Sequence, residues 1–467
     1  MATNMYFEQF YLGCLSHASY MLGSDGIAAV VDPQRDIGIY LEEAAKHGLA
    51  IRYVIETHLH ADFVSGHQEL AKRTGAAIYL GSKAGAKFPH VDVRDGDVLE
   101  FGHCRLTFLE TPGHTIESIS IVVTNLETSE KPMAVLTGDT LFIGDVGRPD
   151  LSGDFTPQQL AGMLYDSLHS KLLKLPDDVE VYPAHGAGSL CGRQMSSERS
   201  STIGKQKASN YALRPETREE FVRLLTSELP ERPGYFAQEV EINRAGAPPL
   251  GELPQLPALS PAEFASMQKS GATVLDTRPA IEFGPAHIPG SIHVALTGQF
   301  ASWAAIVLGL DKEILIVAED DDKAAETRLR LARVGIERVN GYLDGGIVAW
   351  ILSGLPVAQT PQISVEDLHG MARDIQIVDV RNPAEWQNGH IEHAIPIPLN
   401  KLLSQIGRLD KHKPVAVHCK SGYRSSIASS LLARAGFDQV MNVTGGFDAW
   451  LACKLPFVSA EQATVTS

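Results

Sequence analysis

The sequence lacks the features of a secreted, membrane-spanning or nucleic-acid-binding protein. Only 5 cysteines occur in 467 residues, scattered and odd in number, which is not the pattern of a disulfide framework. No run reaches the roughly 20 apolar residues of a membrane span, and residues 1–10 lack a basic stretch before an apolar core. Acidic residues outnumber basic ones by 56 to 40, which disfavours nucleic acid and anionic membranes as partners. We therefore expect a cytoplasmic protein. A homo-oligomeric state is compatible with these features.

The length and the local patterns predict several α/β domains. A chain of 467 residues suggests roughly three domains at about 100–200 residues each. Up to about residue 239, short β-rich runs alternate with helical stretches such as 39–47 and 66–74, which indicates a mixed α/β domain. A proline-rich segment with little to bury follows. We place domains at 1–240, 259–359 and 360–467, with a linker at 241–258.

The part after the linker repeats itself. Asp276 and Asp379 stand in matching strands 103 residues apart, and the His-Ile pairs at 287 and 390 keep the same shift. In each copy, apolar runs typical of buried strands alternate with helical stretches, for example 314–318 before 324–334. This alternation predicts parallel sheets with helices on both faces.

Histidines and aspartates follow the β-rich runs of the first domain. His58, His60 and Asp62 leave the end of one run together, and strand alternation would put them on one face. Three more such residues follow other runs: His114, Asp139 and His185. Loop-borne histidines and carboxylates on a rigid scaffold are the usual signal of a metal site, and we favour this interpretation over unrelated surface residues.

A cysteine stands at a strand-to-helix turn in the second copy. Cys419 follows the apolar run 415–418 and opens a loop formed by Lys420, Ser421, Gly422, Tyr423 and Arg424. Backbone N–H groups and the positive end of a helix would surround the sulfur and favour the thiolate. A buried cysteine acting as a small apolar residue is the commoner alternative. In the first copy Glu319 stands 100 residues earlier, at the place of Cys419, so we expect that copy to be inert and to act as a spacer or docking surface.

The second copy resembles a rhodanese domain. The resemblance lies in Asp379-Val380-Arg381, Gly389-His390-Ile391, the C-x-x-G-x-R loop from Cys419 to Arg424, and Gly445-Gly446 with Trp450. It implies a sulfurtransferase that carries sulfane sulfur as a persulfide on Cys419. A Cys-x5-Arg phosphatase, built on a related loop, is the competing interpretation.

The first domain resembles the metallo-β-lactamase superfamily, whose fold is an αββα sandwich. The motifs are His58-Leu59-His60-Ala61-Asp62, Gly113-His114-Thr115, Gly138-Asp139-Thr140 and His185. Binuclear zinc hydrolases of this superfamily have a histidine after the aspartate of the first motif, where this chain has Phe63. One metal ion is therefore expected rather than two.

Gly147-Arg148-Pro149-Asp150 resembles a segment of the persulfide dioxygenases of the same superfamily. The resemblance implies one Fe(II) held by His58, His114 and Asp139, two histidines and a carboxylate as in ferrous oxygenases. His60, Asp62 and His185 would orient the ligands, with His60 as a further ligand if the metal were zinc. Arg148 would steady the substrate or a loop, or form only a surface ion pair.

Taken together, the resemblances cover nearly the whole chain and imply a persulfide dioxygenase fused to tandem rhodanese domains. Such an enzyme oxidises a low-molecular-weight persulfide with O2 to sulfite and thiol. The rhodanese domain forms or uses thiosulfate, and the whole serves sulfide detoxification. A glyoxalase II-like zinc thioester hydrolase fused to a sulfurtransferase is the first alternative, and a non-enzymatic sulfur carrier is the second.

Overall fold

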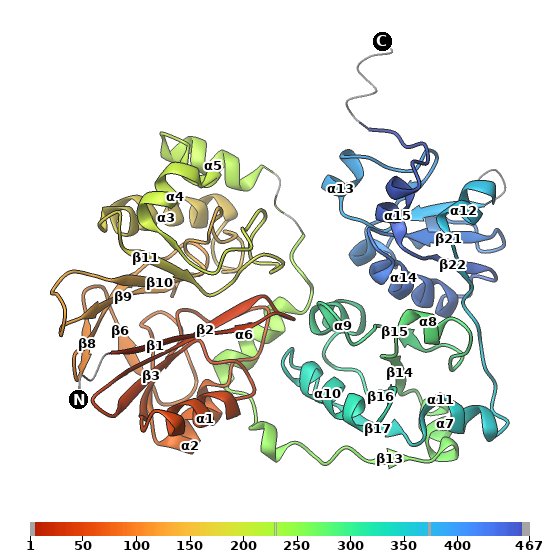
Figure 1. Cartoon of the computed structure of the whole chain (residues 1–467), viewed down its shortest axis with the longest axis horizontal. Coiled ribbons are helices and arrows are strands. Elements are labelled where there is room, and N and C mark those ends of the chain that lie inside the picture. The colour runs from red at the N-terminus through yellow and green to blue at the C-terminus, as the bar shows by residue number, and fades with distance from the viewer. Residues whose placement is uncertain (1–4, 228, 230, 372–374, 460–467) are drawn as a thin grey trace, which may run out of the picture. The chain divides into compact units, whose positions relative to one another are not determined.

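The computed structural model describes residues 5–227, 229, 231–371 and 375–459 (Figure 1). Residues 1–4, the first part of the N-terminal segment 1–10 considered above, lie outside the described residues. The chain forms two compact units, one of residues 1–254 with 331–335, and one of residues 255–330 with 336–467. Among the described residues, no helix has the length and apolar character needed to cross a membrane.

Two six-stranded sheets form the first unit. The first sheet has the order β1-β2-β3-β4-β5-β6. Its strands are β1 (Tyr6–Leu12), β2 (His17–Ser24), β3 (Ile27–Val31), β4 (Ala50–Ile55), β5 (Ala77–Gly81) and β6 (Val91–Val93). The second sheet has the order β12-β11-β10-β9-β8-β7. Its strands are β7 (Val98–Phe101), β8 (Cys104–Glu110), β9 (Ile119–Asn125), β10 (Ala134–Gly138), β11 (Glu180–Pro183) and β12 (Ser201–Thr202).

Apolar side chains of both sheets meet in one core, where Tyr20 and Val31 of the first sheet pack with Phe108 and Ile121 of the second. Helices cover the outer faces (Figure 1). The helices of this unit are α1 (Gly38–Lys46), α2 (His67–Thr74), α3 (Pro157–Ser170), α4 (Ile203–Ser209), α5 (Arg218–Thr226) and α6 (Phe236–Ala245). α1 and α2 pack on the first sheet, and α3 and α5 pack on the second. The expected αββα sandwich is confirmed.

Helix α6 extends to Ala245, into the segment that the sequence suggested as a linker. Its side chains explain why it continues there. Phe236, Glu239 and Asn243 recur at helical spacing and are buried against the first unit. The proline-rich character begins only after this helix.

The second unit contains two sheets of identical topology, which confirms the predicted parallel sheets. Their orders are β13-β17-β16-β14-β15 and β18-β22-β21-β19-β20, and every pairing in them is parallel. The strands are β13 (Ala258–Leu259), β14 (Thr273–Asp276), β15 (Ile292–His293), β16 (Ile314–Val317), β17 (Val339–Leu343), β18 (Gln362–Ile363), β19 (Gln376–Asp379), β20 (Ile395–Pro396), β21 (Val415–His418) and β22 (Val440–Val443).

The helices of the two copies are α7 (Pro261–Lys269), α8 (Ala280–Phe283), α9 (Phe300–Leu308), α10 (Asp321–Ala332), α11 (Gly346–Leu352), α12 (Val365–Met371), α13 (Pro383–Gln387), α14 (Tyr423–Arg434) and α15 (Gly446–Ala452). Sequence signals fix several of their starts. α13 begins after Asn382, whose side chain accepts the N–H of Glu385, and the Glu385 side chain accepts the N–H of Asn382 in return. β21 is buried along its whole length, as expected for a central parallel strand.

Candidate metal centre and cysteine loop

The candidate metal ligands of the first unit lie in loops that follow strands. β4 ends at Ile55, and His58 stands in the loop after it. His114 lies between β8 and β9, Asp139 directly follows β10, and His185 lies two residues after β11. Both sheets therefore contribute to one buried cluster, as the spacing of these residues suggested.

His58, His114 and Asp139 form one group. One ligand atom from each lies within 4.8 Å of the others, and all three side chains are buried. Nε2 of His114 is 3.3 Å from Oδ2 of Asp139, and Nε2 of His58 is 3.8 Å from the same oxygen. Two imidazoles and one carboxylate thus face one point.

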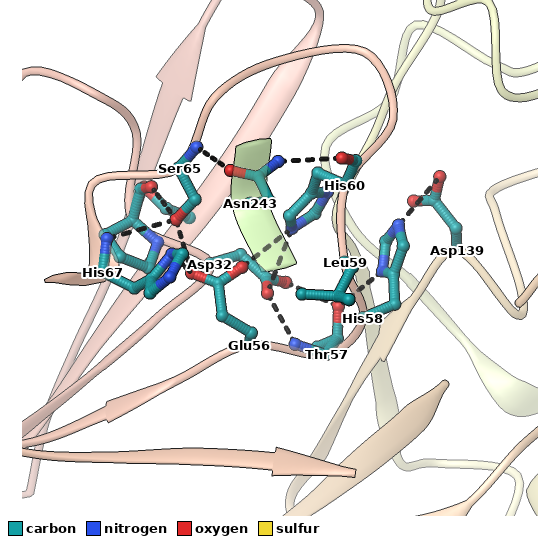
Figure 2. Close-up of polar contacts among 12 residues, drawn as sticks. Asp32, Glu56, Thr57, His58, Leu59, His60, Ser65, His67, Asp139 and Asn243 are labelled. Carbon is teal, nitrogen blue, oxygen red and sulfur yellow. Dashed lines mark hydrogen bonds and ion pairs between the residues drawn. The ribbon is translucent and has the colours of Figure 1, made fainter. Parts of the chain in front are cut away.

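Hydrogen bonds fix which ring nitrogen of each histidine is free. Nδ1 of His114 lies 3.0 Å from the carbonyl oxygen of Arg148, which can only accept. The Thr57 hydroxyl donates to Asp32, so its oxygen accepts from Nδ1 of His58 at 3.0 Å (Figure 2). In both rings Nδ1 therefore carries the hydrogen, and Nε2 keeps its lone pair for a ligand.

Burial lowers the pKa of both His58 and His114, so the two imidazoles are neutral. Among the described residues, neither Nε2 atom has a hydrogen-bond partner. A neutral imidazole with an unpartnered, buried lone pair is the form that binds a metal ion.

His185 lies behind Asp139. Its Nδ1 is 2.8 Å from Oδ1 of Asp139, and its Nε2 is 3.1 Å from Oδ2 of Asp62. Burial opposes a charge on this ring, but the two carboxylates outweigh burial and raise the pKa of His185 well above its usual value. Burial likewise opposes the charge of Asp139, but His185 and the other imidazoles hold its pKa well below the usual range. His185 is thus placed to orient the Asp139 carboxylate.

His60 and Asp62 do not face the same point as His58. They group with His185 instead, and Nε2 of His60 lies 3.2 Å from Oδ1 of Asp32 and 3.5 Å from Oε2 of Glu56 (Figure 2). The expected alternation fails because the strand ends before the motif, and a loop has no period of two. The sequence motif is therefore split between two neighbouring groups.

Phe63 fills the space beside the second group. Its side chain is fully buried, and its ring centroid lies 4.4 Å from that of His60 and 4.1 Å from that of His17. His60, Asp62 and His185 form a group that could itself hold an ion, and Phe63 adds an apolar ring beside it. The single metal ion expected from the sequence stays a prediction.

The second unit presents the cysteine loop. Cys419 directly follows β21, is 1% exposed, and its sulfur accepts the N–H of Gly422 at 3.1 Å. The N–H of Phe447, in the first turn of α15, donates to the carbonyl of Cys419. Gly446 is required here because a Cβ at this position would lie 2.5 Å from that carbonyl oxygen. Lys420 and Ser421 are exposed at the tip of the loop.

Arg424 does not offer its guanidinium group to the loop. Both of its terminal nitrogens donate to the Glu385 carboxylate at 2.7 Å. In a Cys-x5-Arg phosphatase the arginine that binds the phosphate oxygens is the sixth residue after the cysteine, where this chain has Ser425. Arg424 stands one position earlier and is paired with Glu385, so both observations disfavour that alternative. Glu385 in turn caps α13, which keeps the pair in place.

In the first copy Glu319 takes the topological place of Cys419. It follows β16, which lies between β14 and β17 as β21 lies between β19 and β22. The exposed carboxylate precedes α10, whose first turn holds Asp321 and Asp322. This local negative charge is unsuited to an anionic sulfur donor.

Two known families match parts of this chain. Residues 12–185 match the family described as the metallo-beta-lactamase superfamily, and residues 260–353 and 364–453 each match the rhodanese-like domain. The solved structure of a metallo-beta-lactamase from Staphylococcus aureus subsp. aureus COL is 32% identical, with a TM-score of 0.66. The similarity covers 73% of this chain and 99% of that one. The chain belongs to the metallo-β-lactamase superfamily. It carries two rhodanese-like domains in addition.

The curated relatives include proteins named for different activities. A "Hydroxyacylglutathione hydrolase" from Polaromonas sp. is 36% identical over 34% of this chain, and the human "Persulfide dioxygenase ETHE1, mitochondrial" is 31% identical over 36% of it. The aligned part spans only 57% and 63% of the lengths of these two relatives. The expected relation to dioxygenases fused with rhodanese domains is confirmed at the level of family.

The metallo-β-lactamase fold binds metal, and the residues of this chain fit an ion. The two unpartnered Nε2 atoms and the Asp139 carboxylate supply three ligands of the types that iron, zinc and manganese accept. The hydrogen bonds of both Nδ1 atoms hold the rings in the required direction.

Other residues near the candidate metal centre were not predicted from the sequence. Cys191 is buried, and its sulfur belongs to one group with Asp139 and His185. His17 is buried against Phe63 at the start of β2. Asn243 of α6 donates to the carbonyl of His60 and accepts from the N–H of Ser65 (Figure 2), and it also donates to the carbonyl of Phe63, each at 2.8 Å. These residues come from distant parts of the chain, and no local motif marks them.

Arg148 lies beside the same site but is occupied by protein groups. Its guanidinium donates to both oxygens of Asp150 and to the carbonyl of Leu190, and its N–H donates to the carbonyl of Cys191. It is 6% exposed. Of the two roles that the resemblance implied for it, these contacts favour steadying a loop over binding the substrate.

Proposed function

We propose that the first unit is a mononuclear iron dioxygenase that oxidises a low-molecular-weight persulfide, and that the second rhodanese copy transfers sulfane sulfur through Cys419. The observation that carries this proposal is the ligand set itself. His58, His114 and Asp139 face one point, while the apolar ring of Phe63 lies beside the neighbouring group of His60, Asp62 and His185. Two histidines and one carboxylate leave several coordination positions open, as non-haem iron oxygenases require.

Each side chain of the proposed centre has a defined task. His58 and His114 stay neutral through burial, and Asp139 stays ionised beside His185. Phe63 keeps water from the neighbouring group. A bound ferrous ion supplies the redox chemistry that the side chains lack. In the overall reaction, persulfide, O2 and water give thiol, sulfite and two protons.

The proposed task of Cys419 is to carry one sulfur atom. Its thiolate attacks the sulfane sulfur of a donor, the sulfur–sulfur bond of the donor breaks, and the thiol part leaves with the electron pair. The N–H of Gly422 and its neighbours in the loop stabilise the persulfide anion that remains. Transfer of that sulfur to sulfite yields thiosulfate, and the reverse direction supplies persulfide.

A zinc thioester hydrolase joined to a sulfurtransferase is the second candidate. The similarity to the hydroxyacylglutathione hydrolase from Polaromonas sp. supports it. The same three ligands accept zinc, so the coordination set alone does not separate the two activities. The missing histidine at Phe63 argues against a binuclear hydrolase.

Oxygen uptake by the full-length protein, loaded with iron without air and given glutathione persulfide, tests the proposal. We expect uptake in the wild type, loss of at least about 100-fold in His114→Ala, and unchanged uptake in Cys419→Ser. Thiosulfate formation should disappear in Cys419→Ser while sulfite accumulates. Thioester cleavage by the zinc-loaded protein without oxygen uptake by the iron-loaded protein would instead establish the hydrolase. Absence of both activities would leave a sulfur carrier.

A further inference from the structure

A row of side chains on α14 contacts the rhodanese copy that lacks the cysteine. Tyr423, Ser426, Ser430 and Arg434 recur at helical spacing, so they lie along one face of α14. All four side chains reach one short segment of the first copy, residues 290–295, which contains β15. The helix that follows the cysteine loop is therefore held along its length by its inert neighbour.

The contacts are direct hydrogen bonds. The Tyr423 hydroxyl donates to the carbonyl of Ala295 at 3.0 Å, and the Ser426 hydroxyl lies 2.8 Å from Nδ1 of His293. The N–H of His293 donates to the Ser430 hydroxyl at 3.0 Å, and Arg434 donates to the carbonyl of Gly290 at 2.6 Å. Both serines and His293 are at most 2% exposed, so water does not compete with these bonds.

The direction of the central bond follows from the second nitrogen of the ring. Nε2 of His293 lies 2.8 Å from the carbonyl oxygen of Arg278, which only accepts, so this nitrogen carries the hydrogen. Burial lowers the pKa of His293, so the ring is neutral. Nδ1 is then an acceptor, and the Ser426 hydroxyl donates to it. His293 thus links the sheet of the first rhodanese copy to α14 in one defined tautomer.

The arrangement is not reciprocal between the two copies. The second copy has His393, Pro396 and Pro398 where the first has Gly290, His293 and Ala295. A proline at the place of His293 has neither the ring acceptor nor the N–H. On α10 of the first copy, Lys323, Glu326 and Arg330 stand at the places of Tyr423, Ser426 and Ser430. There, Lys323 and Arg330 both pair with Glu326. The first copy therefore supports α14 of the second copy, and in the described part of the chain the second copy offers no matching contacts to α10.

We infer that the inert rhodanese copy positions the cysteine loop, with His293 as the main positioning residue. Tyr423 directly follows Gly422, whose N–H donates to the sulfur of Cys419. Fixing α14 through Tyr423 and Ser426 therefore fixes the direction of the N–H groups that stabilise the thiolate or the persulfide. The turnover measurement below rests on the proposed sulfurtransferase activity, whereas the alkylation measurement does not.

The test uses the full-length protein with His293→Ala, Ser426→Ala, the double variant, His293→Asn and the control His287→Ala. His287 is also a buried histidine of the first copy, but its ring bonds to the carbonyl of Phe283 in its own copy. The alkylation rate of Cys419 by iodoacetamide at pH 7 is followed by peptide mass spectrometry, with the exposed Cys453 as internal reference. Transfer of sulfur from thiosulfate to cyanide is measured in parallel.

We expect His293→Ala to slow alkylation of Cys419 by about two- to fivefold, the size of a weakened helix-terminus effect. The kcat of sulfur transfer should fall as well, and alkylation of Cys453 should not change. The double variant should be no slower than His293→Ala, because both changes remove the same bond. His293→Asn, which keeps an acceptor near Nδ1, should recover part of the rate.

A Cys419 alkylation rate that is unchanged in His293→Ala, or slowed equally in His287→Ala, would overturn the inference. Additive losses in the double variant would do the same. If His293→Ala does not fold, Tyr423→Phe replaces it, since it removes one hydrogen bond without changing the volume of the ring; an unchanged rate in that variant then overturns the inference. Altered alkylation in a protein whose wild type transfers no sulfur would support the positioning role and refute the proposed sulfurtransferase.

Discussion

At the scale of single residues, the candidate metal centre depends on Asp139 and on what surrounds it. Its carboxylate faces two imidazoles whose free nitrogens point toward it, and His185 holds it from behind. Removal of His185 would leave the carboxylate buried without this partner, at a cost of about 1–3 kcal/mol or more. The candidate ligand Asp139 is thus positioned by His185, a group that need not bind an ion itself.

Phe63 gives a direct test of the single-ion centre. We predict that Phe63→His raises the metal content of zinc-grown protein from about one to about two ions per chain, because an imidazole would join His60, Asp62 and His185. Elemental analysis of the purified protein measures this. Phe63→Leu, which keeps an apolar side chain, should stay near one ion. A content of one in both variants would show that Phe63 does not limit the second site.

At the scale of elements, α6 fixes the loop that bears the first motif. Asn243 satisfies three backbone groups of that loop, at His60 and Ser65 (Figure 2) and at Phe63. A loop without internal secondary structure needs such partners, because its buried N–H and carbonyl groups are otherwise unsatisfied. The end of the first unit therefore shapes the site near its beginning.

We predict that Asn243→Leu loosens this loop. The buried N–H of Ser65 would lose its acceptor, and each unpaired group costs about 1–3 kcal/mol. Hydrogen exchange of residues 57–67 should become at least about tenfold faster, since that factor corresponds to about 1.4 kcal/mol. Asn210→Leu is the matched control, because the buried Asn210 instead bonds the carbonyls of Phe142 and Asp145. Equal acceleration of residues 57–67 in both variants would contradict a specific role of α6.

At the scale of the whole molecule, the second unit contains several buried histidines that the fold keeps neutral. Burial lowers the pKa of His287, His293 and His418 below the usual value of about 6.5. The unfolded chain binds more protons than the native one as pH falls below that value. The free energy of unfolding should therefore decrease as pH falls from about 7 toward 5, by at most about 1.4 kcal/mol per pH unit for each such histidine.

Tryptophan fluorescence can follow this unit separately in the full-length protein. All four tryptophans, Trp303, Trp350, Trp386 and Trp450, lie in the second unit. Urea titrations at several pH values should show a falling midpoint between pH 7 and pH 5. His287→Asn should reduce that dependence, and a change at the exposed His393 should not. A midpoint independent of pH in the wild type would contradict the prediction.

The sequence by itself determined the parts of the protein that depend on local pattern. The β-rich runs, the repeat and the strand-to-helix turn at Cys419 follow from hydrophobic periodicity and turn residues, which act over short distances along the chain. The residue types of the metal site were also visible, since histidines and aspartates followed separate strands. The prediction of one metal ion rather than two came from a single residue, Phe63.

Only the tertiary structure decided which of these groups meet. His58 and His60 stand only two positions apart in sequence, yet they lie in different groups because the loop after β4 does not keep the alternation of a strand. Asn243 reaches Ser65 across 178 positions, and His293 meets Ser426 across 133. Such contacts depend on how distant elements pack, and a packing surface leaves no periodic mark in the sequence. The motifs predicted the chemical groups of the candidate sites, and the packing of distant elements determined their geometry.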